Sequence, residues 1–317
     1  MSPLDEPTLL EDAVLADLRV LASDAMRGRH PDTLGSARAR EYIVARLHEL
    51  GVTPLGASYE HPFSWTGDDG RYKYGTNVVG LLAGTARGGR TIVLSAHYDH
   101  LGTTGDGDGP PTIPPDRIYS GADDNASGVA ALLGLARHFT RHRPRHSLVL
   151  AFFDAEEADL KGSSHFVAAP PIALDTVALN VNLDMLGRNL DERLWAVGAR
   201  HHPWIREVLA PVAERAPLRL EFGHDRFGWV PFLSWDWTTE SDHGAFHDRG
   251  IPFVYFGVAN HEDTHETSDT ADGIDEEFFV RAFRTVMDAV EVLDADSTLV
   301  NRGGAEEPEE ARRNSNG

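Results

Sequence analysis

The chain has 317 residues, and 41% of them are hydrophobic, which is enough for a single α/β body with a large core. The 29 Lys and Arg against 50 Asp and Glu give a formal net charge of −21, which argues against nucleic acid and anionic membranes as partners. The lack of Cys excludes disulfides and thiolate metal sites, so a metal would have to be held by His and carboxylate side chains.

The start of the chain shows no targeting signal. Residues 1–14 are acidic and lack the basic start and the apolar run of a signal peptide. No later segment approaches the length of a membrane span. We therefore expect a soluble, cytoplasmic protein.

Hydrophobic spacing predicts an alternation of helices and short strands along the chain. The predicted helices cover 8–24, 36–50, 129–139, 202–214, 241–250 and 273–294, and the predicted strands cover 77–82, 91–96, 148–153, 177–185, 194–197 and 251–257. We expect one domain over 1–296 and a polar, disordered tail over 297–317.

Side chains that can bind a metal lie at the ends of several predicted strands. His97 and Asp99 follow the strand 91–96, and in this spacing Asp99 can orient the His97 ring so that one nitrogen faces a metal. The apolar run 148–153 leads to Glu156 and Glu157, of which one can bind a cation while the other moves a proton. Asp184 lies at the end of the strand 177–185.

Two further segments add acids and histidines. The sequence GADDNASG, residues 121–128, predicts a tight turn before a helix, with Asp123 or Asp124 pointing inward. After the strand 251–257 the chain carries His261 and His265, four residues apart. The segment 222–237 is dense in aromatic residues and could line an apolar pocket.

Five potential ligands thus come from four strand ends and one turn: His97, Asp124, Glu157, Asp184 and His265. If they meet at one edge of a sheet, they are more than a single tetrahedral ion needs. A bridging carboxylate would allow two ions about 3.5–4 Å apart, as in two-metal hydrolases.

The order of these motifs resembles the M28 family of di-zinc aminopeptidases, of the bacterial type without an inserted protease-associated domain. The motifs are the His-x-Asp pair, GADDNASG, the adjacent Glu pair, NLDM and HETSDT, and together they span most of the chain. This resemblance implies a single-domain α/β/α sandwich with a central mixed, mostly parallel, twisted sheet. It also implies a peptide or amino-acid amide substrate and two Zn²⁺ ions, with Co²⁺ or Mn²⁺ as alternatives.

The positions of these residues in the family motifs imply which zinc ion each of them would bind. His97 and Asp184 would hold one zinc, Glu157 and His265 the other, and Asp124 would bridge them. The resemblance also makes the Asp124–Asn125 peptide bond a candidate for the cis form. The remaining family roles fall on Asp99, which would orient His97, and on Glu156, which would be the general base.

One position departs from the family pattern. Members commonly carry Tyr directly before the last His ligand, where its hydroxyl can stabilise the oxyanion, but this chain has Thr264. The oxyanion would then be stabilised by Tyr255, by some residue of the aromatic segment 222–237, or by zinc alone.

Other readings remain open. Glutaminyl cyclases are similar in fold but bind one zinc, and Asp242 lies where such enzymes keep a functional acid. Tyr255 and Asp242 are therefore our candidates for substrate binding. A carboxypeptidase, an aminoacylase or a non-catalytic binding relative would also fit the fold, although a binding module has no reason to retain Glu156.

Overall fold

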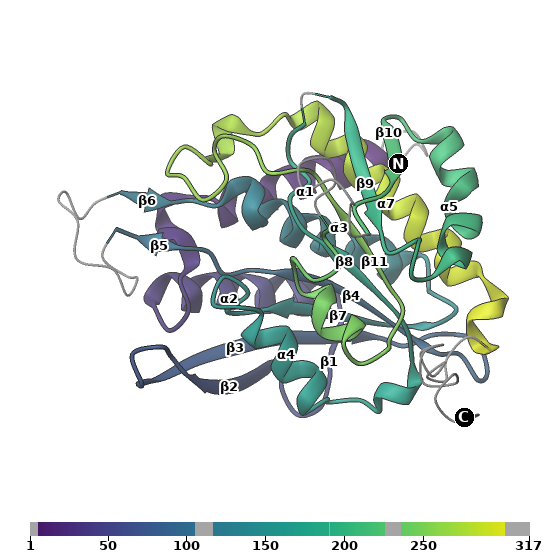
Figure 1. Ribbon diagram of the computed structural model, residues 1–317, viewed down its shortest axis with the longest axis horizontal. Coiled ribbons are helices and arrows are strands. Elements are labelled where there is room, and N and C mark those ends of the chain that lie inside the picture. The colour runs from purple at the N-terminus through teal and green to yellow at the C-terminus, as the bar shows by residue number, and fades with distance from the viewer. Residues whose placement is uncertain (1–5, 105–116, 190, 226–235, 302–317) are drawn as a thin grey trace, which may run out of the picture.

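The computed structural model describes residues 6–104, 117–189, 191–225 and 236–301. Its described residues form a nine-stranded sheet in the order β1-β3-β7-β4-β8-β11-β9-β10, with β2 paired to β3, and a separate β5-β6 pair. The four central strands β7, β4, β8 and β11 run parallel, whereas β1, β2 and β3 at one side and the β11-β9 pair are antiparallel. The expected mixed sheet, parallel at its centre, is confirmed (Figure 1).

The elements have the following bounds. The strands are β1 Thr53–Pro54, β2 Glu60–Thr66, β3 Tyr72–Leu82, β4 Thr91–His97, β5 Gly102–Thr103, β6 Ile118–Tyr119, β7 Ser147–Phe153, β8 Val177–Leu183, β9 Arg193–Val197, β10 Arg219–Phe222 and β11 Phe253–Gly257. The α-helices are α1 Glu6–Leu21, α2 Leu34–Glu49, α3 Gly128–Arg141, α4 Lys161–Ala168, α5 Pro203–Arg215, α6 His243–His247 and α7 Glu276–Ala295. Short helical turns lie at η1 Asp24–Arg29, η2 Ala122–Ser127, η3 Leu174–Thr176, η4 Ala271–Gly273 and η5 Ser297–Asn301.

Helices cover both faces of the sheet, which explains why its central strands are mainly apolar. On β4, Ile92 and Leu94 pack into a large core together with α1, α2, α3, α5 and α7, whereas Val93 between them packs into a second core with α4 and α6. Because successive side chains of a strand point to opposite faces, a strand buried on both sides needs an unbroken apolar run. The α/β/α layering expected from the sequence is confirmed.

The structure differs from the sequence-based expectations mainly at the edges. Strand β3 begins at Tyr72 rather than at Asn77, because it pairs with β2, which had not been predicted and which contains Pro62. Figure 1 shows β2 and β3 side by side at the lower edge of the molecule. Pro62 lacks an N–H for the ladder, and such residues are tolerated on edge strands.

The first residues of the predicted tail, 297–301, lie within the described structure. Ser297–Asn301 form the 3-10 turn η5, and Leu299 is fully buried in the large core. These residues therefore pack with the domain, whereas residues 302–317 lie outside the described residues. The domain boundary itself stays a prediction.

Within the described residues, none of the helices combines the length and the apolar character needed to cross a membrane.

Candidate metal centre

The parallel strands deliver the predicted ligands to one edge of the sheet. His97 is the last residue of β4, Asp184 directly follows β8, and Glu156 and Glu157 follow β7 by three and four residues. Because β7, β4 and β8 are parallel neighbours, their carboxyl ends lie side by side. Open α/β sheets bind their ligands at this edge.

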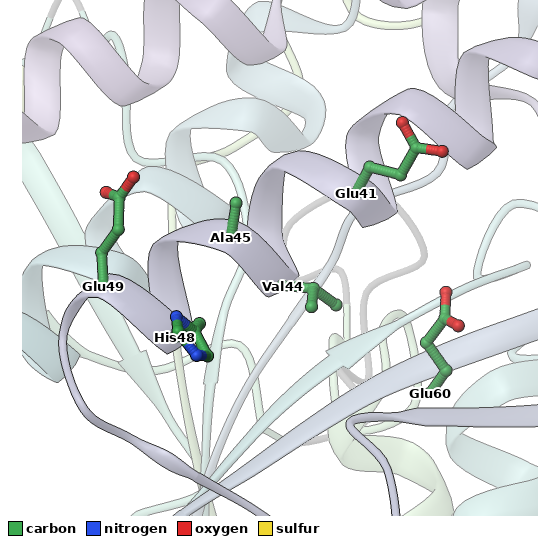
Figure 2. Close-up of a pocket in the computed structure, with 6 residues that line it drawn as sticks. All are labelled: Glu41, Val44, Ala45, His48, Glu49 and Glu60. Carbon is green, nitrogen blue, oxygen red and sulfur yellow. The ribbon is translucent and has the colours of Figure 1, made fainter.

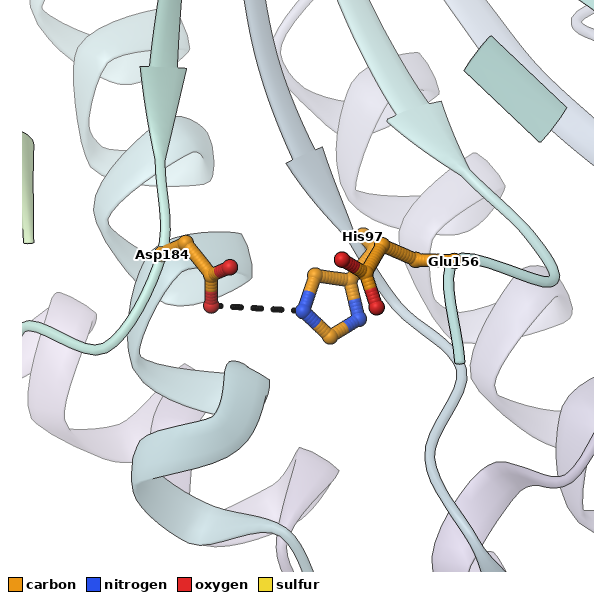
Figure 3. A group of neighbouring side chains, drawn as sticks. All are labelled: His97, Glu156 and Asp184. Carbon is orange, nitrogen blue, oxygen red and sulfur yellow. Dashed lines mark hydrogen bonds and ion pairs between the residues drawn. The ribbon is translucent and has the colours of Figure 1, made fainter. Parts of the chain in front are cut away.

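Two groups of side chains meet there. In the first cluster, ligand atoms of His97, Glu156 and Asp184 all lie within 4.8 Å of one another (Figure 3). His97 Nε2 is 3.2 Å from Asp184 Oδ1 and 3.2 Å from Asp124 Oδ1. The other ring nitrogen, Nδ1, is 3.3 Å from the backbone oxygen of Asp99. A hydrogen on Nδ1 would bind this oxygen and leave Nε2 free to bind a metal.

The second cluster lies on the other side of Asp124. His265 Nε2 is 3.1 Å from Asp124 Oδ2 and 3.2 Å from Glu157 Oε2. The two oxygens of Asp124 thus face different histidines, Oδ1 towards His97 and Oδ2 towards His265. This is the arrangement that a bridging carboxylate requires.

The spacing of these atoms fits metal ions. Two donors bound to one tetrahedral zinc at about 2.0–2.1 Å are separated by about 3.3 Å. The distances from His97 and His265 to their carboxylate neighbours are 3.1–3.2 Å. The donor set of imidazole and carboxylate groups is also one that zinc prefers, so both clusters pass this test.

The turn that carries Asp124 is fixed by the backbone. The Asp124–Asn125 peptide bond is cis, as the resemblance implied. The backbone N–H groups of Asp123 and Asp124 both donate to the carboxylate of Asp269, at 2.9–3.1 Å. Gly121 at the start of the turn has φ +55°, a left-handed conformation that favours glycine.

Asp99 supports the site in a way that the sequence did not predict, and its expected role of orienting His97 stays a prediction. Its carboxylate accepts the backbone N–H groups of Glu156 at 3.0 Å and of Glu157 at 3.3 Å. The distance from Asp99 Oδ1 to His97 Nδ1 is 3.7 Å, which is too long for a hydrogen bond. The Asp99 carboxylate therefore holds the Glu156–Glu157 turn and lies within ion-pair distance of His97, whereas the hydrogen-bond distance to His97 is that of the Asp99 backbone oxygen.

The acids and histidines shift one another's pKa values. Burial raises the pKa of Glu156 well above its usual range, against the opposing charge of His97. Burial also acts to raise the pKa of Asp124, but hydrogen bonds from His265 and His97 outweigh it and hold this pKa well below its usual range. Hydrogen bonds to Asp124 and Glu157 raise the pKa of His265 to about 10. Asp124 is therefore ionised, as a ligand must be.

The two candidates for substrate binding lie beside the clusters but are buried. The Tyr255 hydroxyl donates to the backbone oxygen of Asp184 at 3.3 Å, and the absence of a side chain at Gly257 makes room for this contact. Asp242 is fully buried, and burial raises its pKa to about 7. Their role towards a substrate stays a prediction.

Thr264, at the position of the family tyrosine, is used within its own loop. Its hydroxyl accepts the backbone N–H of His261 at 3.0 Å. Of the aromatic segment 222–237, which was a further source of an oxyanion donor, residues 226–235 lie outside the described residues.

Several supporting residues were missed at the level of sequence. Arg29 is fully buried and donates to the backbone oxygens of Leu21, Tyr98, Ser120 and Gly121. The others are His100, which contacts Glu157, His261, which contacts Asp123, and Asp269. His100, His261 and Asp269 all lie in or beside the motifs that identified the ligands, and this proximity was the available signal.

A separate depression of about 460 Å³ lies on the surface between α2 and β2 (Figure 2). It is lined by Glu41, Val44, Ala45, His48, Glu49 and Glu60, and none of these residues belongs to either cluster. Glu49 and Glu60 are already paired with Arg46 and Arg40. We therefore assign it no part in the chemistry.

Comparison with known proteins gives relatives of more than one activity. A probable zinc metalloprotease of Pyrenophora teres f. teres (strain 0-1) is 28% identical over 194 residues, covering 57% of this chain and 40% of that protein. The glutaminyl-peptide cyclotransferase of Bos taurus is 29% identical over 297 residues, covering 79% of this chain and 73% of that protein. The aligned part spans less than half the length of the fungal protein.

The fold and the family agree with these relatives. A leucine aminopeptidase precursor from Bacteroides thetaiotaomicron VPI-5482 superposes with a TM-score of 0.69 at 21% identity, covering 90% of this chain and 97% of that chain. At this identity the similarity shows the fold alone. The model of the family described as Peptidase family M28 matches residues 77–290, which include all five predicted ligands. The chain therefore belongs to peptidase family M28.

Proposed function

We propose that this protein is a zinc-dependent aminopeptidase that binds two metal ions and removes the first residue of peptides or amino-acid amides. The observation that carries the proposal is the placement of Asp124, whose two carboxylate oxygens lie 3.2 Å from His97 and 3.1 Å from His265. His97, Asp124 and Asp184 would hold one zinc. Asp124, Glu157 and His265 would hold the other.

Glu156 is the residue we assign to proton transfer. It lies in the first cluster beside His97 and Asp184, and its neighbour Glu157 lies in the second cluster. The bound zinc ions would polarise the scissile carbonyl and make a water molecule acidic enough to react at neutral pH. The Glu156 carboxylate would take a proton from the attacking water and return it to the leaving amine. Its raised pKa suits a group that must hold this proton between the two steps.

Acids beside the first cluster would favour substrates with a free N-terminus. Burial raises the pKa of Glu156, and the nearby charges of Asp184 and Asp242 add to this rise, so several acids lie together in this part of the edge. The α-amino group of a substrate is a cation and would be attracted to it. Half of the His265 side chain is exposed, at 54%, so the second cluster is open to solvent, and a substrate can approach from that side.

A glutaminyl cyclase is the second candidate, because the bovine cyclotransferase aligns with 79% of this chain. Metal content separates the two proposals. The contact of Asp124 with both histidines favours two zinc ions per chain, whereas a single tightly held zinc would favour the cyclase.

The proposal is tested with a panel of aminoacyl-anilides, each offered with a free and with an acetylated α-amino group. We expect hydrolysis of the free substrates only, loss of this activity with a chelator, and recovery when zinc is added back. Elemental analysis of the same preparation should give two zinc ions per chain. Hydrolysis of the acetylated substrates at an equal rate would point to an aminoacylase or an endopeptidase instead.

A further inference from the structure

We propose that His100 is a positioning residue that ties down one oxygen of Glu157 and so sets the metal affinity of the second cluster. This inference rests on the proposed function, in which Glu157 binds a metal ion. His100 is not one of the predicted ligands, although its Nδ1 lies with oxygens of Asp124 and Glu157 in a group whose atoms are all within 4.8 Å of one another. The question is therefore whether His100 binds the metal or supports a residue that does.

The distances favour a supporting role for His100 over the role of a ligand. Its Nδ1 is 2.6 Å from Glu157 Oε1 and 4.0 Å from Asp124 Oδ2. Two ligands of a tetrahedral zinc would be about 3.3 Å apart, so the first distance is too short and the second too long. A separation of 2.6 Å is instead that of a strong, charge-assisted hydrogen bond. His265, at 3.1 Å and 3.2 Å from Asp124 and Glu157, has the spacing of a ligand.

The hydrogen bond divides the work of the Glu157 carboxylate. Oε1 accepts from His100, whereas Oε2 faces His265. An ionised carboxylate can only accept, so the hydrogen between the two groups belongs to His100 Nδ1. The hydrogen bond to Oε1 thus holds the Glu157 carboxylate in the orientation in which Oε2 faces His265.

The His100 ring also touches the other segments that build the second cluster. It is fully buried, and a Cβ atom at Gly121 would lie only 2.6 Å from its ring carbons, so the turn that carries Asp124 packs directly against it. The ring centroid is 5.8 Å from that of His265. Its Nε2 is buried and has no hydrogen-bond partner among the described residues. The hydrogen bond to Glu157 is thus the shorter of the ring's two polar contacts with the second cluster, the other being the 4.0 Å ion pair with Asp124.

Loss of such a support is expected to weaken metal binding rather than to abolish it. Residues that hold a ligand in place by hydrogen bonds typically change metal affinity by about 10–100-fold. The first cluster has its own support, since His97 Nδ1 faces the backbone oxygen of Asp99. The effect should therefore fall on one of the two ions.

The test compares two substitutions that differ in one hydrogen-bond donor. In His100→Asn the amide nitrogen lies close to the place of Nδ1 and can still donate to Glu157, whereas His100→Leu fills a similar volume without a donor. His142→Leu on the exposed end of α3 serves as the control for a lost histidine. Zinc affinities are measured by competition with a chromogenic chelator, and the metal-free proteins are compared by circular dichroism to check their folding.

We expect His100→Leu to lower the affinity for one zinc ion by about 10–100-fold and to leave the affinity for the other unchanged. The zinc affinities of His100→Asn and His142→Leu should stay within a few-fold of those of the wild type. Equal affinities in the leucine and asparagine variants would overturn the inference, as would a uniform loss at both ions. His100→Ala gives the same comparison should leucine not fit the buried site.

A wild-type protein with one zinc per chain would contradict the two-metal proposal and not this inference. The asparagine and leucine variants would then be compared on that ion, with the same two outcomes.

Discussion

Glu156 and Glu157 are neighbours in the chain, but their carboxylates belong to different clusters. Ala155 before them has φ +59°, and the Asp99 carboxylate accepts the backbone N–H of both glutamates. This sharp, clamped turn directs Glu156 towards His97 and Glu157 towards His265. A division of labour between them is therefore built into the backbone.

The substitution Glu156→Gln tests this division. We expect kcat to fall by about 10²–10⁴-fold, because the amide cannot accept the proton of the attacking water. Two bound zinc ions should remain, since Glu156 is not one of the proposed ligands. Activity assays with elemental analysis of the same samples measure both quantities, and Glu262→Gln at an exposed position of the loop before His265 is the control. Activity near that of the wild type would exclude Glu156 as the base.

Individual residues also show how far the sequence could lead. That the five proposed ligands lie close together was predictable, because each follows an apolar strand or a Gly-rich turn and parallel strands bring such ends together. The contact partners of Asp99 and His100 were not predictable. A shift of a side chain by less than the length of one bond decides which atoms it contacts. Spacing in the chain carries no such information.

At the scale of elements, the short turn η1 connects the first helix to the metal centre. Arg27, Gly28 and Arg29 have φ of 49°, 67° and 54°, which a sequence-based prediction does not expect for two arginines. A Cβ atom at Gly28 would lie 2.3 Å from the backbone oxygen of Gly102, so this turn is pressed against the β5-β6 pair. The turn delivers Arg29 into the interior behind the ligands.

The substitution Arg29→Met should destabilise this connection. Arg29 donates to four backbone oxygens at 2.6–2.9 Å, and two of these belong to Tyr98 and Gly121, which flank His97 and the turn of Asp124. Buried acceptors left without a donor cost about 1–3 kcal/mol each, so we expect a loss of at least about 3 kcal/mol in the free energy of unfolding.

Denaturant unfolding measures that loss, and Arg27→Met, which removes an exposed charge two residues away, is the control. Equal stabilities of the two variants would show that the buried carbonyl contacts of Arg29 do not matter.

At the scale of the whole molecule, hydrophobic patterning predicted the centre of the sheet and its main helices. It did not predict the edge strands of the sheet. The strands β4, β7, β8 and β11 are mainly apolar, as burial on both faces requires, although Ser95, Asn180 and Asn182 are buried polar residues within them. Strand β2, in contrast, has alternating exposure and a proline, and only its partner β3 shows that it is a strand. Edge strands depend on tertiary pairing more than on their own sequence.

A group of histidines away from the metal centre gives the molecule a sensitivity to acid. His202 contacts Phe253, and burial, with help from His201 and His247, lowers its pKa to about 4. In the unfolded chain this pKa is about 6.5, so the unfolded state binds the proton first as the pH falls. The stabilisation is complete above pH 6.5 and is lost between pH 6.5 and 4, by at most about 1.4 kcal/mol per pH unit.

The substitution His202→Phe should reduce this acid sensitivity. The free energy of unfolding would then depend less steeply on pH between 6.5 and 4, and the change is measured by denaturant unfolding across that range. His48→Gln on the exposed face of α2 is the control. An unchanged slope in the phenylalanine variant would mean that His202 is protonated in the folded protein as readily as in the unfolded chain.

The claim that the protein is an aminopeptidase is tested most directly with a short peptide that begins with glutamine, followed by mass spectrometry of the products. Hydrolysis adds water across the first peptide bond, so the account predicts free glutamine and a peptide shorter by one residue, both dependent on zinc. A product of full length that has lost one ammonia, with no free glutamine, would contradict the account and identify a cyclase.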